Sequence, residues 1–195
     1  GDHRDLHLSL RRQRQMCIRD SVYSAVAKVS NIFYRSFNFD EITKLDEPII
    51  NSNCNISKSS FIENGAIIGK NVNISPGCFI GYNCIIGDNS SIDCNTAITN
   101  SVIAENVHIG RNSSIGQQGF GFAISKNENI KIFHTGRVIL QADVNIGSSC
   151  TIDRGSFGDT IIGQNTFFDN LCHVAHNVII GNNCIFRIIF ILHCM

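Results

Sequence analysis

A spacing of six residues constrains this chain more than any other feature of its sequence. Large apolar residues, mostly isoleucine, recur at every sixth position over long stretches between Ile50 and Phe186. A period of six fits neither the 3.6-residue turn of an α-helix nor a heptad. When it runs this far, it is the signature of a hexapeptide-repeat parallel β-helix. The repeating positions are Ile50, Ile56, Ile62, Ile68, Ile74, Ile80, Ile86, Ile92, Ile98, Ile103, Ile109, Ile115, Leu140, Ile146, Ile152, Ile162, Phe168, Val174, Ile180 and Phe186.

Each repeat also carries a small inward residue and a corner residue. A small or compact side chain stands two positions before the large one, as Ala66 does before Ile68. Residues two apart in a strand point to the same face, so both are expected to point inward. Three positions after the large residue, Asn or Gly tolerates a positive φ at low cost, so the chain can turn there. Resemblance to known hexapeptide proteins implies that three such sides close a coil of 18 residues. The expected corners are Asn53, Asn71, Asn83, Asn89, Asn95, Asn106, Asn112, Asn165, Asn177, Asn183, Gly65, Gly77 and Gly155.

The spacing divides the chain into four segments. We expect the β-helix over residues 48–186, interrupted by an inserted loop over 117–137. Residues 22–47 predict one short helix followed by a connector. Residues 1–21 resemble translated adapter sequence in part and are expected to be a non-native segment, whereas residues 187–195 abandon the repeat as an aberrant tail. The expected fold class is all-β, a left-handed parallel β-helix with one short N-terminal helix; the left hand follows from resemblance to known hexapeptide proteins.

Composition excludes several classes of protein. The formal net charge is zero, so a nucleic-acid-binding footprint is not expected. No stretch is long and apolar enough to predict a transmembrane segment. Most of the nine cysteines take the small inward slot, which predicts buried thiols rather than disulfides or a zinc site and fits a cytoplasmic location. The cysteines in that slot are Cys54, Cys78, Cys84, Cys150, Cys172 and Cys184.

The repeat is interrupted twice, over residues 117–137 and 154–160. Function in a solenoid usually resides at such breaks, because insertions form loops on one face. The first break carries Phe120 and Phe122 between glycines, without the strand–helix context of a phosphate-binding loop. These two side chains could line an apolar groove or pack on a neighbouring subunit. A loop that only folds over the coil is the alternative.

Two histidines stand out beyond the second break. Because Cys172 and Val174 point inward, His173 between them should point outward, and His176 lies at the next corner. A neutral imidazole at an exposed corner can serve as a general base, although position alone also fits a solvated surface histidine. Two histidines are too few for a catalytic zinc, and His108 does not obviously converge on them, so no metal site is expected.

Several blocks together resemble the UDP-3-O-acylglucosamine N-acyltransferase family of lipid A biosynthesis, over roughly residues 22–186. The hexapeptide pattern is shared by many transferases, whereas the two blocks in the breaks are more specific. The matching blocks are Gly-Phe-Gly-Phe-Ala at 119–123, Lys-Ile at 131–132 leading to Gly-Arg-Val at 136–138, Thr-Ile-Asp-Arg-Gly at 151–155, Asp-Thr-Ile-Ile-Gly at 159–163, Asp-Asn at 169–170 and Ala-His-Asn at 175–177.

The resemblance implies an acyl transfer. His176 would be the general base that takes a proton from the 2-amino group of UDP-3-O-acylglucosamine, while that amine attacks a 3-hydroxyacyl thioester on acyl carrier protein. Asp169 and Asn170 would position His176 or the phosphopantetheine arm, and Phe120 and Phe122 are further candidates for positioning substrate or carrier. No cofactor beyond that arm is implied.

The family also implies a cytoplasmic homotrimer with its site between neighbouring coils. His173 falls where the family has another polar residue and is assigned a structural or peripheral role. Only the connector that trails the family's uridine-binding domain matches, within residues 22–47. The resemblance therefore predicts the activity of the parent enzyme rather than that of this chain alone.

Two other interpretations remain open at this point. One is a different hexapeptide-repeat acyltransferase that acts on another nucleotide sugar, which the two blocks in the breaks disfavour. The other is a non-catalytic β-solenoid, which would present flat, repetitive threonine ladders. The outward residues are instead irregular, as Tyr82, Asp93 and His108 illustrate.

Overall fold

The chain divides into two compact units, each of which is considered separately. One consists of the N-terminal segment to Ser36 together with Gly121–Phe133, and the other of Phe37–Phe120 with His134–Met195. The expected non-native segment 1–21 lies outside the described residues. The computed structural model describes residues 22–34, 39–124, 128–187 and 191–192.

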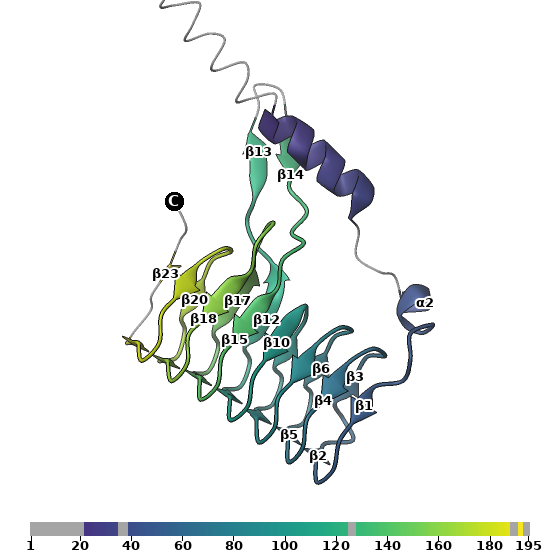
Figure 1. The fold of residues 1–195 in the computed structure, drawn as a ribbon, viewed down its shortest axis with the longest axis vertical. Coiled ribbons are helices and arrows are strands. Elements are labelled where there is room, and N and C mark those ends of the chain that lie inside the picture. Colours follow the sequence, from purple (N-terminus) through teal and green to yellow (C-terminus); the bar gives the residue numbers. More distant parts are fainter. Residues whose placement is uncertain (1–21, 35–38, 125–127, 188–190, 193–195) are drawn as a thin grey trace, which may run out of the picture. The chain divides into compact units, whose positions relative to one another are not determined.

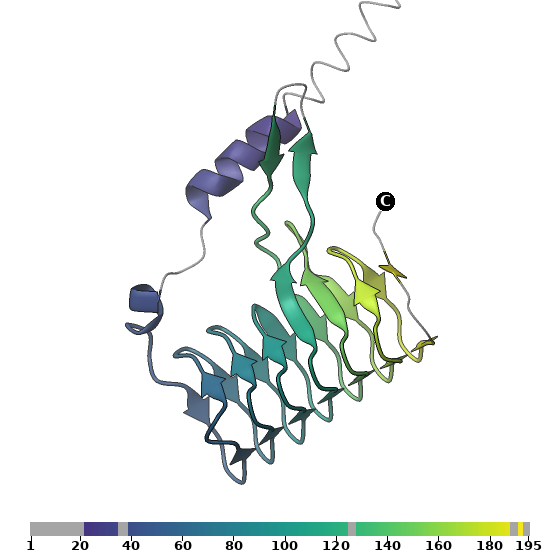
Figure 2. The same ribbon diagram turned by 180° about the vertical axis from the view of Figure 1, so that it is seen from behind.

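The larger unit is a parallel β-helix of three seven-stranded sheets, called A, B and C (Figures 1 and 2). Each strand pairs in parallel with the strand one coil further on, as Ile67 pairs with Ile85 and Ile161 with Ile179. These partners are eighteen residues apart, so the predicted three-sided coil is confirmed. The predicted left-handed β-helix is confirmed as well.

The strands are short and follow the repeat. Sheet A contains β1 (Ile49–Ile50), β4 (Ile67–Ile68), β7 (Ile85–Ile86), β10 (Ser101–Ile103), β15 (Val138–Leu140), β18 (Thr160–Ile162) and β21 (Ile179–Ile180). Sheet B contains β2 (Asn55–Ile56), β5 (Asn73–Ile74), β8 (Ser91–Ile92), β11 (His108–Ile109), β16 (Asn145–Ile146), β19 (Phe167–Phe168) and β22 (Ile185–Phe186). Sheet C contains β3 (Phe61–Ile62), β6 (Phe79–Ile80), β9 (Ala97–Ile98), β12 (Ser114–Gln118), β17 (Thr151–Arg154), β20 (His173–Val174) and β23 (Ile191–Leu192).

The interior of the solenoid is a stack of the large residues from the six-residue spacing. Ile68, Ile80 and Ile152 are examples, and each is almost fully shielded from water. Complete burial of one such side chain is worth roughly 1.5–3 kcal/mol. Because the contact repeats in every coil, burial of apolar surface is the main term that stabilises the unit.

The inward cysteines pack into this core as predicted. Cys78, Cys84, Cys150 and Cys172 are buried, and the seven cysteines that the structure describes are all thiols. Burial raises the pKa of Cys84 to about 11, and it likewise raises the pKa of Cys150 to about 11. The neutral thiol is therefore the form that the core stabilises, in keeping with a small apolar role.

The corners use left-handed backbone at the predicted asparagines. Asn71 has a φ of 56° and Asn177 a φ of 63°. The prediction is wrong for Gly155, whose φ is not in that region. A β-carbon on Gly155 would lie 1.7 Å from the carbonyl oxygen of Gly158, so this glycine permits a close backbone approach instead. At the corner after β19, Leu171 adopts a φ of 60°, which is unusual for a bulky residue.

The smaller unit joins the N-terminal helix to the insertion. Residues 22–33 are helical, and β13 (Phe122–Ile124) pairs antiparallel with β14 (Asn129–Lys131). Nδ2 of Asn31 donates to the carbonyl oxygen of Lys131 at 2.7 Å, and the backbone N–H of Phe133 donates to Oγ of Ser30 at 3.3 Å. The inserted segment, predicted as a loop, therefore contains a hairpin that the predicted helix contacts.

The ends of the repeat depart slightly from the predicted boundaries. The connector contains a four-residue helix, α2 (Phe39–Ile42). At the other end β23 pairs with β20, so strand pairing continues one step into the segment expected to be an aberrant tail. Among the described residues, no helix is long and apolar enough to cross a membrane.

Candidate active site

His176 lies half-buried at the corner that follows β20, where the second break of the repeat reaches it. Its Nδ1 is 2.9 Å from Oδ1 of Asn177. The same Oδ1 accepts hydrogen bonds from the backbone N–H of Ser156 at 2.9 Å and from its Oγ at 2.7 Å. The break over residues 154–160 thus connects through Asn177 to the predicted general base.

Two residues from the first break enclose the ring of His176. The imidazole of His134 is completely buried and meets that of His176 edge to face, with ring centroids 5.0 Å apart. A β-carbon on Gly119 would lie 2.9 Å from Cδ2 and 3.0 Å from Cβ of His176. The ring of His176 can therefore occupy this position only because residue 119 is glycine and has no side chain.

A buried carboxylate lies beside the same glycine. Asp153 is only 5% exposed, and its Oδ1 accepts a hydrogen bond from Nε2 of Gln117 at 3.0 Å. Oγ of Ser114 in turn donates to Oε1 of Gln117. A β-carbon on Gly119 would also lie 3.2 Å from Oδ2 of Asp153, so this carboxylate and the ring of His176 border one small space.

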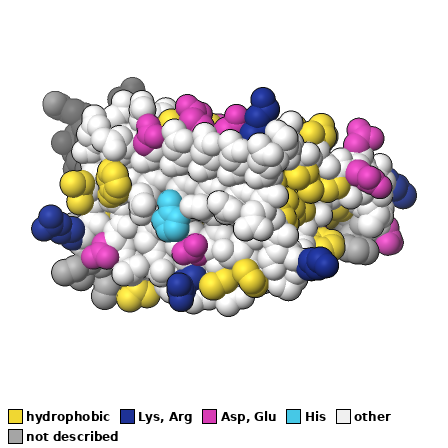
Figure 3. Space-filling model, turned by 90° about the horizontal axis from the view of Figure 1, so that it is seen from below, with side chains coloured by type: hydrophobic (Ala, Val, Ile, Leu, Met, Phe, Trp, Pro, Cys, Tyr) yellow, Lys and Arg dark blue, Asp and Glu magenta, His cyan; other side chains and the backbone are white. Residues whose placement is uncertain are grey.

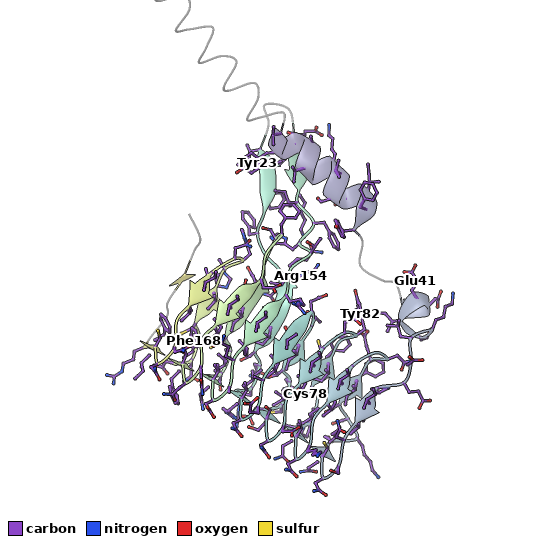
Figure 4. All side chains as sticks on the ribbon, in the orientation of Figure 1. Tyr23, Glu41, Cys78, Tyr82, Arg154 and Phe168 are labelled. Atoms are coloured by element: carbon purple, nitrogen blue, oxygen red, sulfur yellow. The ribbon has the colours of Figure 1, made fainter. Side chains whose placement is uncertain are left out.

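Arg154 ends β17 next to Asp153 and is also buried. Burial lowers the pKa of Arg154, while nearby Tyr82 opposes that shift. Figure 4 shows Arg154 and Tyr82 on the same side of the solenoid. Arg154 is therefore a desolvated cation directly beside Asp153 in the chain, and a buried charge of this kind is held where it has a partner.

The loop at the second break is fixed by backbone contacts. The N–H of Thr135 and its Oγ1 both donate to the carbonyl oxygen of Ser156, at 2.7 and 3.0 Å. The N–H of Gly136 donates to the carbonyl oxygen of Gly155 at 3.0 Å. A β-carbon on Gly136 would lie 1.9 Å from the carbonyl oxygen of Gly158, so these segments touch where only glycine fits.

The other predicted site residues lie elsewhere. Asp169 and Asn170 occupy the corner before β20, and His176 occupies the corner after it, so one protomer does not bring them together. Oδ1 of Asn170 instead accepts a local hydrogen bond from the N–H of Ser148 at 2.7 Å. Phe120 is 83% exposed, whereas Phe122 belongs to the hairpin unit.

His173 points outward from β20, as predicted. Its Nδ1 lies 2.7 Å from Oγ1 of Thr151, and its Nε2 lies 3.9 Å from Oδ2 of Asp153. Within the part of the chain that the structure describes, no group of three His, Cys, Asp or Glu side chains is arranged to hold a metal ion.

Sequence reasoning did not single out His134, Gly119 or Ser156 for this site. The six-residue count stops in both breaks, so it says nothing about which residues face His176. One signal was available: all three belong to the two interruptions, where a solenoid is expected to carry its function.

On the face drawn in Figure 3, the described acidic and basic side chains are interspersed rather than gathered by sign.

Fold and site together define a hexapeptide-repeat β-helix with a histidine at a corner that the interruptions of the repeat contact. The model of the family described as "GMPPB C-terminal domain" matches residues 42–156, and that of "Bacterial transferase hexapeptide (six repeats)" matches residues 159–187. Because the first match spans more than half of the chain, the chain belongs to that family.

Curated relatives carry the name that the resemblance suggested. The UDP-3-O-acylglucosamine N-acyltransferase of Methylorubrum extorquens is 46% identical over 90 residues, which are 46% of this chain and 26% of the relative. That of Caulobacter vibrioides is 45% identical over 94 residues, which are 48% of this chain and 28% of the relative. The resemblance is confirmed, and the chain spans about a quarter of the length of these relatives.

Solved structures share the fold. A UDP-N-acetylglucosamine acyltransferase from Bacteroides fragilis is 33% identical with a TM-score of 0.59, covering 67% of this chain and 49% of that one. A UDP-N-acetylglucosamine acyltransferase from Campylobacter jejuni is 27% identical with a TM-score of 0.58 and the same coverage. The N-acyltransferase AntD from Bacillus cereus, 23% identical with a TM-score of 0.54 over 75% of this chain and 81% of that one, supports the fold alone.

Proposed function

We propose that this chain supplies the β-helix of an N-acyltransferase. The enzyme moves a 3-hydroxyacyl chain from acyl carrier protein to the 2-amino group of UDP-3-O-acylglucosamine in lipid A biosynthesis, with His176 as general base. The names of the relatives support the acceptor sugar and the transfer of an acyl group to its nitrogen. The observation that carries the role of His176 is its place beside both breaks: the second contacts it through Asn177, and His134 and Gly119 of the first lie against its ring.

The reaction is a simple exchange at a thioester carbonyl. The amine nitrogen forms a bond to the carbonyl carbon while His176 takes its proton, and the carbon–sulfur bond then breaks. The proton on His176 passes to the departing phosphopantetheine sulfur, which restores the base. A backbone N–H that faces the carbonyl oxygen would stabilise the tetrahedral oxyanion. No cofactor is required beyond the carrier's arm, and both carrier and substrate fit a cytoplasmic enzyme.

The geometry favours a site shared between protomers. Asp169 and Asn170 lie at the far end of β20 from His176, so they would reach this histidine from a neighbouring chain. There they would position the base or the phosphopantetheine arm, and exposed Phe120 would offer an apolar surface to the acyl chain or carrier. Phe122 remains a candidate for the same role.

Sheet A provides a surface for such an assembly. Its outward positions are all β-branched aliphatic residues in register, whereas sheet B begins with outward Asn, Ser and His. A continuous apolar stripe of this kind usually marks an interface. We place the contact of a homotrimer on this stripe. Its members are Ile49, Ile67, Ile85, Val102, Ile139, Ile161 and Ile179.

The oligomer is tested by mass measurement in solution. Ile85→Lys introduces a charge into the stripe and is expected to convert trimer to monomer in analytical ultracentrifugation. Asn73→Lys, on the outward side of sheet B, is the matched control and should leave the trimer intact. A parent chain that sediments as a monomer, or a trimer that survives Ile85→Lys, would contradict this placement.

Activity is tested in a context that supplies the rest of the enzyme. The matched segment of the Caulobacter relative is replaced by the segment of this chain, and N-acylation is followed with a 3-hydroxyacyl carrier thioester and UDP-3-O-acylglucosamine. We expect turnover, and a loss of at least roughly 100-fold in His176→Ala, the usual contribution of a general base. Unchanged turnover in His176→Ala would refute the base, and an inactive chimera beside an active relative would refute the substrate assignment.

A second candidate is O-acylation of a related nucleotide sugar, because the solved structures include UDP-N-acetylglucosamine acyltransferases. The same chimera distinguishes the two reactions. Acyl transfer to UDP-N-acetylglucosamine, whose amine is already blocked, would favour this candidate over the N-acyltransferase.

A further inference from the structure

We propose that Ser156 and Asn177 form a positioning pair that fixes the tautomer and the orientation of the His176 ring. The inference rests on the proposed role of His176 as general base. It assigns a purpose to the second interruption of the repeat, which the reaction as written does not otherwise use.

The orientation of the Asn177 amide follows from its neighbour. The backbone N–H of Ser156 is 2.9 Å from the terminal amide atom of Asn177, and an N–H can only donate. That atom must therefore be the carbonyl oxygen Oδ1 rather than the amide nitrogen. The hydroxyl of Ser156, at 2.7 Å from the same oxygen, can donate to it as well.

The tautomer of His176 follows from the amide orientation. Oδ1 of Asn177 can only accept, so Nδ1 of His176, at 2.9 Å, must carry a proton and donate it. In the neutral ring the lone pair then resides on Nε2. Nε2 is thus the nitrogen that can take a proton from the acceptor amine, and Ser156 determines this through Asn177.

Ser156 itself is held in place by the first interruption. Its carbonyl oxygen accepts two hydrogen bonds from Thr135, and the backbone around it is pressed against Gly136 and Gly158. Thr135 follows His134, which packs on the ring of His176. The two breaks therefore meet around one imidazole, one reaching its Nδ1 through Asn177 and the other packing against its ring.

Asn177 is equally well fixed. Its backbone has a φ of 63°, and its N–H donates to Oγ1 of Thr160 at 2.9 Å. Asn183 has nearly the same backbone, with a φ of 59°, and its Oδ1 accepts from Nδ2 of Asn165 at 2.8 Å. Asn183 is therefore a matched corner at a different place on the coil.

The test reads the tautomer of His176 directly. Uniformly ¹⁵N-labelled chain is examined by long-range ¹H–¹⁵N correlation at a pH where the ring is neutral, and His176→Gln assigns the signal. We expect the parent to carry its proton on Nδ1. Asn177→Gly keeps the positive φ but removes the acceptor, and should shift the proton toward Nε2. Asn183→Gly should leave the His176 signal unchanged, and Asn177→Asp, whose carboxylate also accepts, should retain the Nδ1 proton.

Ser156→Ala separates the two hydrogen bonds of Ser156. It removes the hydroxyl but keeps the backbone N–H, so the Nδ1 proton should remain while exchange of that proton becomes faster. A parent with its proton on Nε2, or an unchanged tautomer in Asn177→Gly, would overturn the inference. These spectra require no turnover, so they remain decisive even if the proposed acylation is wrong.

Kinetics in the chimera supply the second readout. Asn177→Gly should lower kcat by about 10- to 100-fold, the effect that loss of an orienting group has on metal-bound histidines. KM for both substrates should stay within about twofold, because a positioning residue does not bind them. Asn177→Asp should recover most of kcat. A raised KM with unchanged kcat would instead make Asn177 a substrate contact and refute the positioning role.

Discussion

Oγ1 of Thr151 lies 2.7 Å from Nδ1 of His173, and the two residues face each other on the paired strands β17 and β20. The arrangement recurs on sheet B, where Oγ of Ser91 lies 2.8 Å from Nδ1 of His108 across β8 and β11. In both places Nε2 of the histidine is 3.9 Å from an aspartate carboxylate. An outward histidine paired in this way is thus a repeated surface feature of the solenoid, distinct from the environment of His176.

We therefore expect His173→Gln to leave catalysis nearly intact. Glutamine retains a hydrogen-bonding side chain beside Thr151, so the free energy of unfolding should fall by no more than about 1 kcal/mol. In the chimera kcat/KM should stay within about threefold of the parent, while His176→Ala loses most activity. A loss in His173→Gln comparable with that of His176→Ala would move His173 into the catalytic machinery.

The steric role of Gly119 predicts a sharper effect. A methyl group at this position would lie 2.9 Å from Cδ2 of His176, which is so close that the methyl group or the ring must move. The methyl group would also lie 3.2 Å from Oδ2 of Asp153, so it has little room to move away from the ring. We expect Gly119→Ala to lower kcat by about tenfold or more, because small displacements of a catalytic group are costly. The measurement is kcat in the chimera together with the thermal midpoint of unfolding.

Gly181→Ala is the control for that substitution, since a β-carbon there meets nothing within 4 Å. It should leave both kcat and the midpoint of unfolding close to the parent values. If Gly119→Ala behaves in the same way, His176 tolerates displacement and the close contact has no functional meaning.

The six-residue spacing predicts the solenoid because the same two inward positions recur in every side of the coil. Ile68 and Ile152 are buried because they occupy the large inward position of their repeats. Asn71 adopts the positive φ that its residue type predicts for a corner. The pattern also placed His173 and His176 outward. Periodic residues are predictable because each one has the same neighbours one coil away.

The surroundings of His176 could not be predicted in this way. His134 and Gly119 lie in a segment without period, and their approach to the ring depends on how two loops meet. Gly155 shows the same limit. Its residue type suggested a positive φ, whereas the reason for a glycine at this position is the close approach of the carbonyl oxygen of Gly158. The resemblance implied a positioning role for Asp169, and the periodicity alone does not show that within one protomer strand β20 lies between Asp169 and His176.

The buried thiols predict a loss of stability at alkaline pH. The pKa of Cys84 and that of Cys150 are each about 11 in the folded chain, against an ordinary value of 9.0. The unfolded chain therefore releases these protons first, so their contribution to stability is present below about pH 9 and declines toward pH 11. We expect the thermal midpoint to fall over that range.

The double variant Cys84→Ala/Cys150→Ala isolates this effect from other groups that titrate in the same range. Alanine occupies the equivalent inward slot at Ala66, so the coil can accommodate it. The variant should start from a lower midpoint at about pH 8, because two sulfur atoms leave the core. Its midpoint should then fall less than that of the parent between about pH 9 and pH 11. If the midpoints of parent and variant fall in parallel with pH, these thiols have the same pKa in the folded and the unfolded chain.

Leu171 offers a stabilising substitution at a corner. It adopts a φ of 60° where the repeat otherwise uses mainly asparagine, and its side chain is 58% exposed. Left-handed backbone costs an ordinary L-residue roughly 1–2 kcal/mol, and asparagine bears that cost more easily. Leu171→Asn should therefore raise the free energy of unfolding by about 1 kcal/mol, measured as a higher urea midpoint at unchanged slope. Leu171→Gln also removes the exposed apolar group but keeps the backbone cost, so it should give no comparable gain. If both variants stabilise the chain equally, the effect comes from removing the exposed apolar group and not from relieving backbone strain.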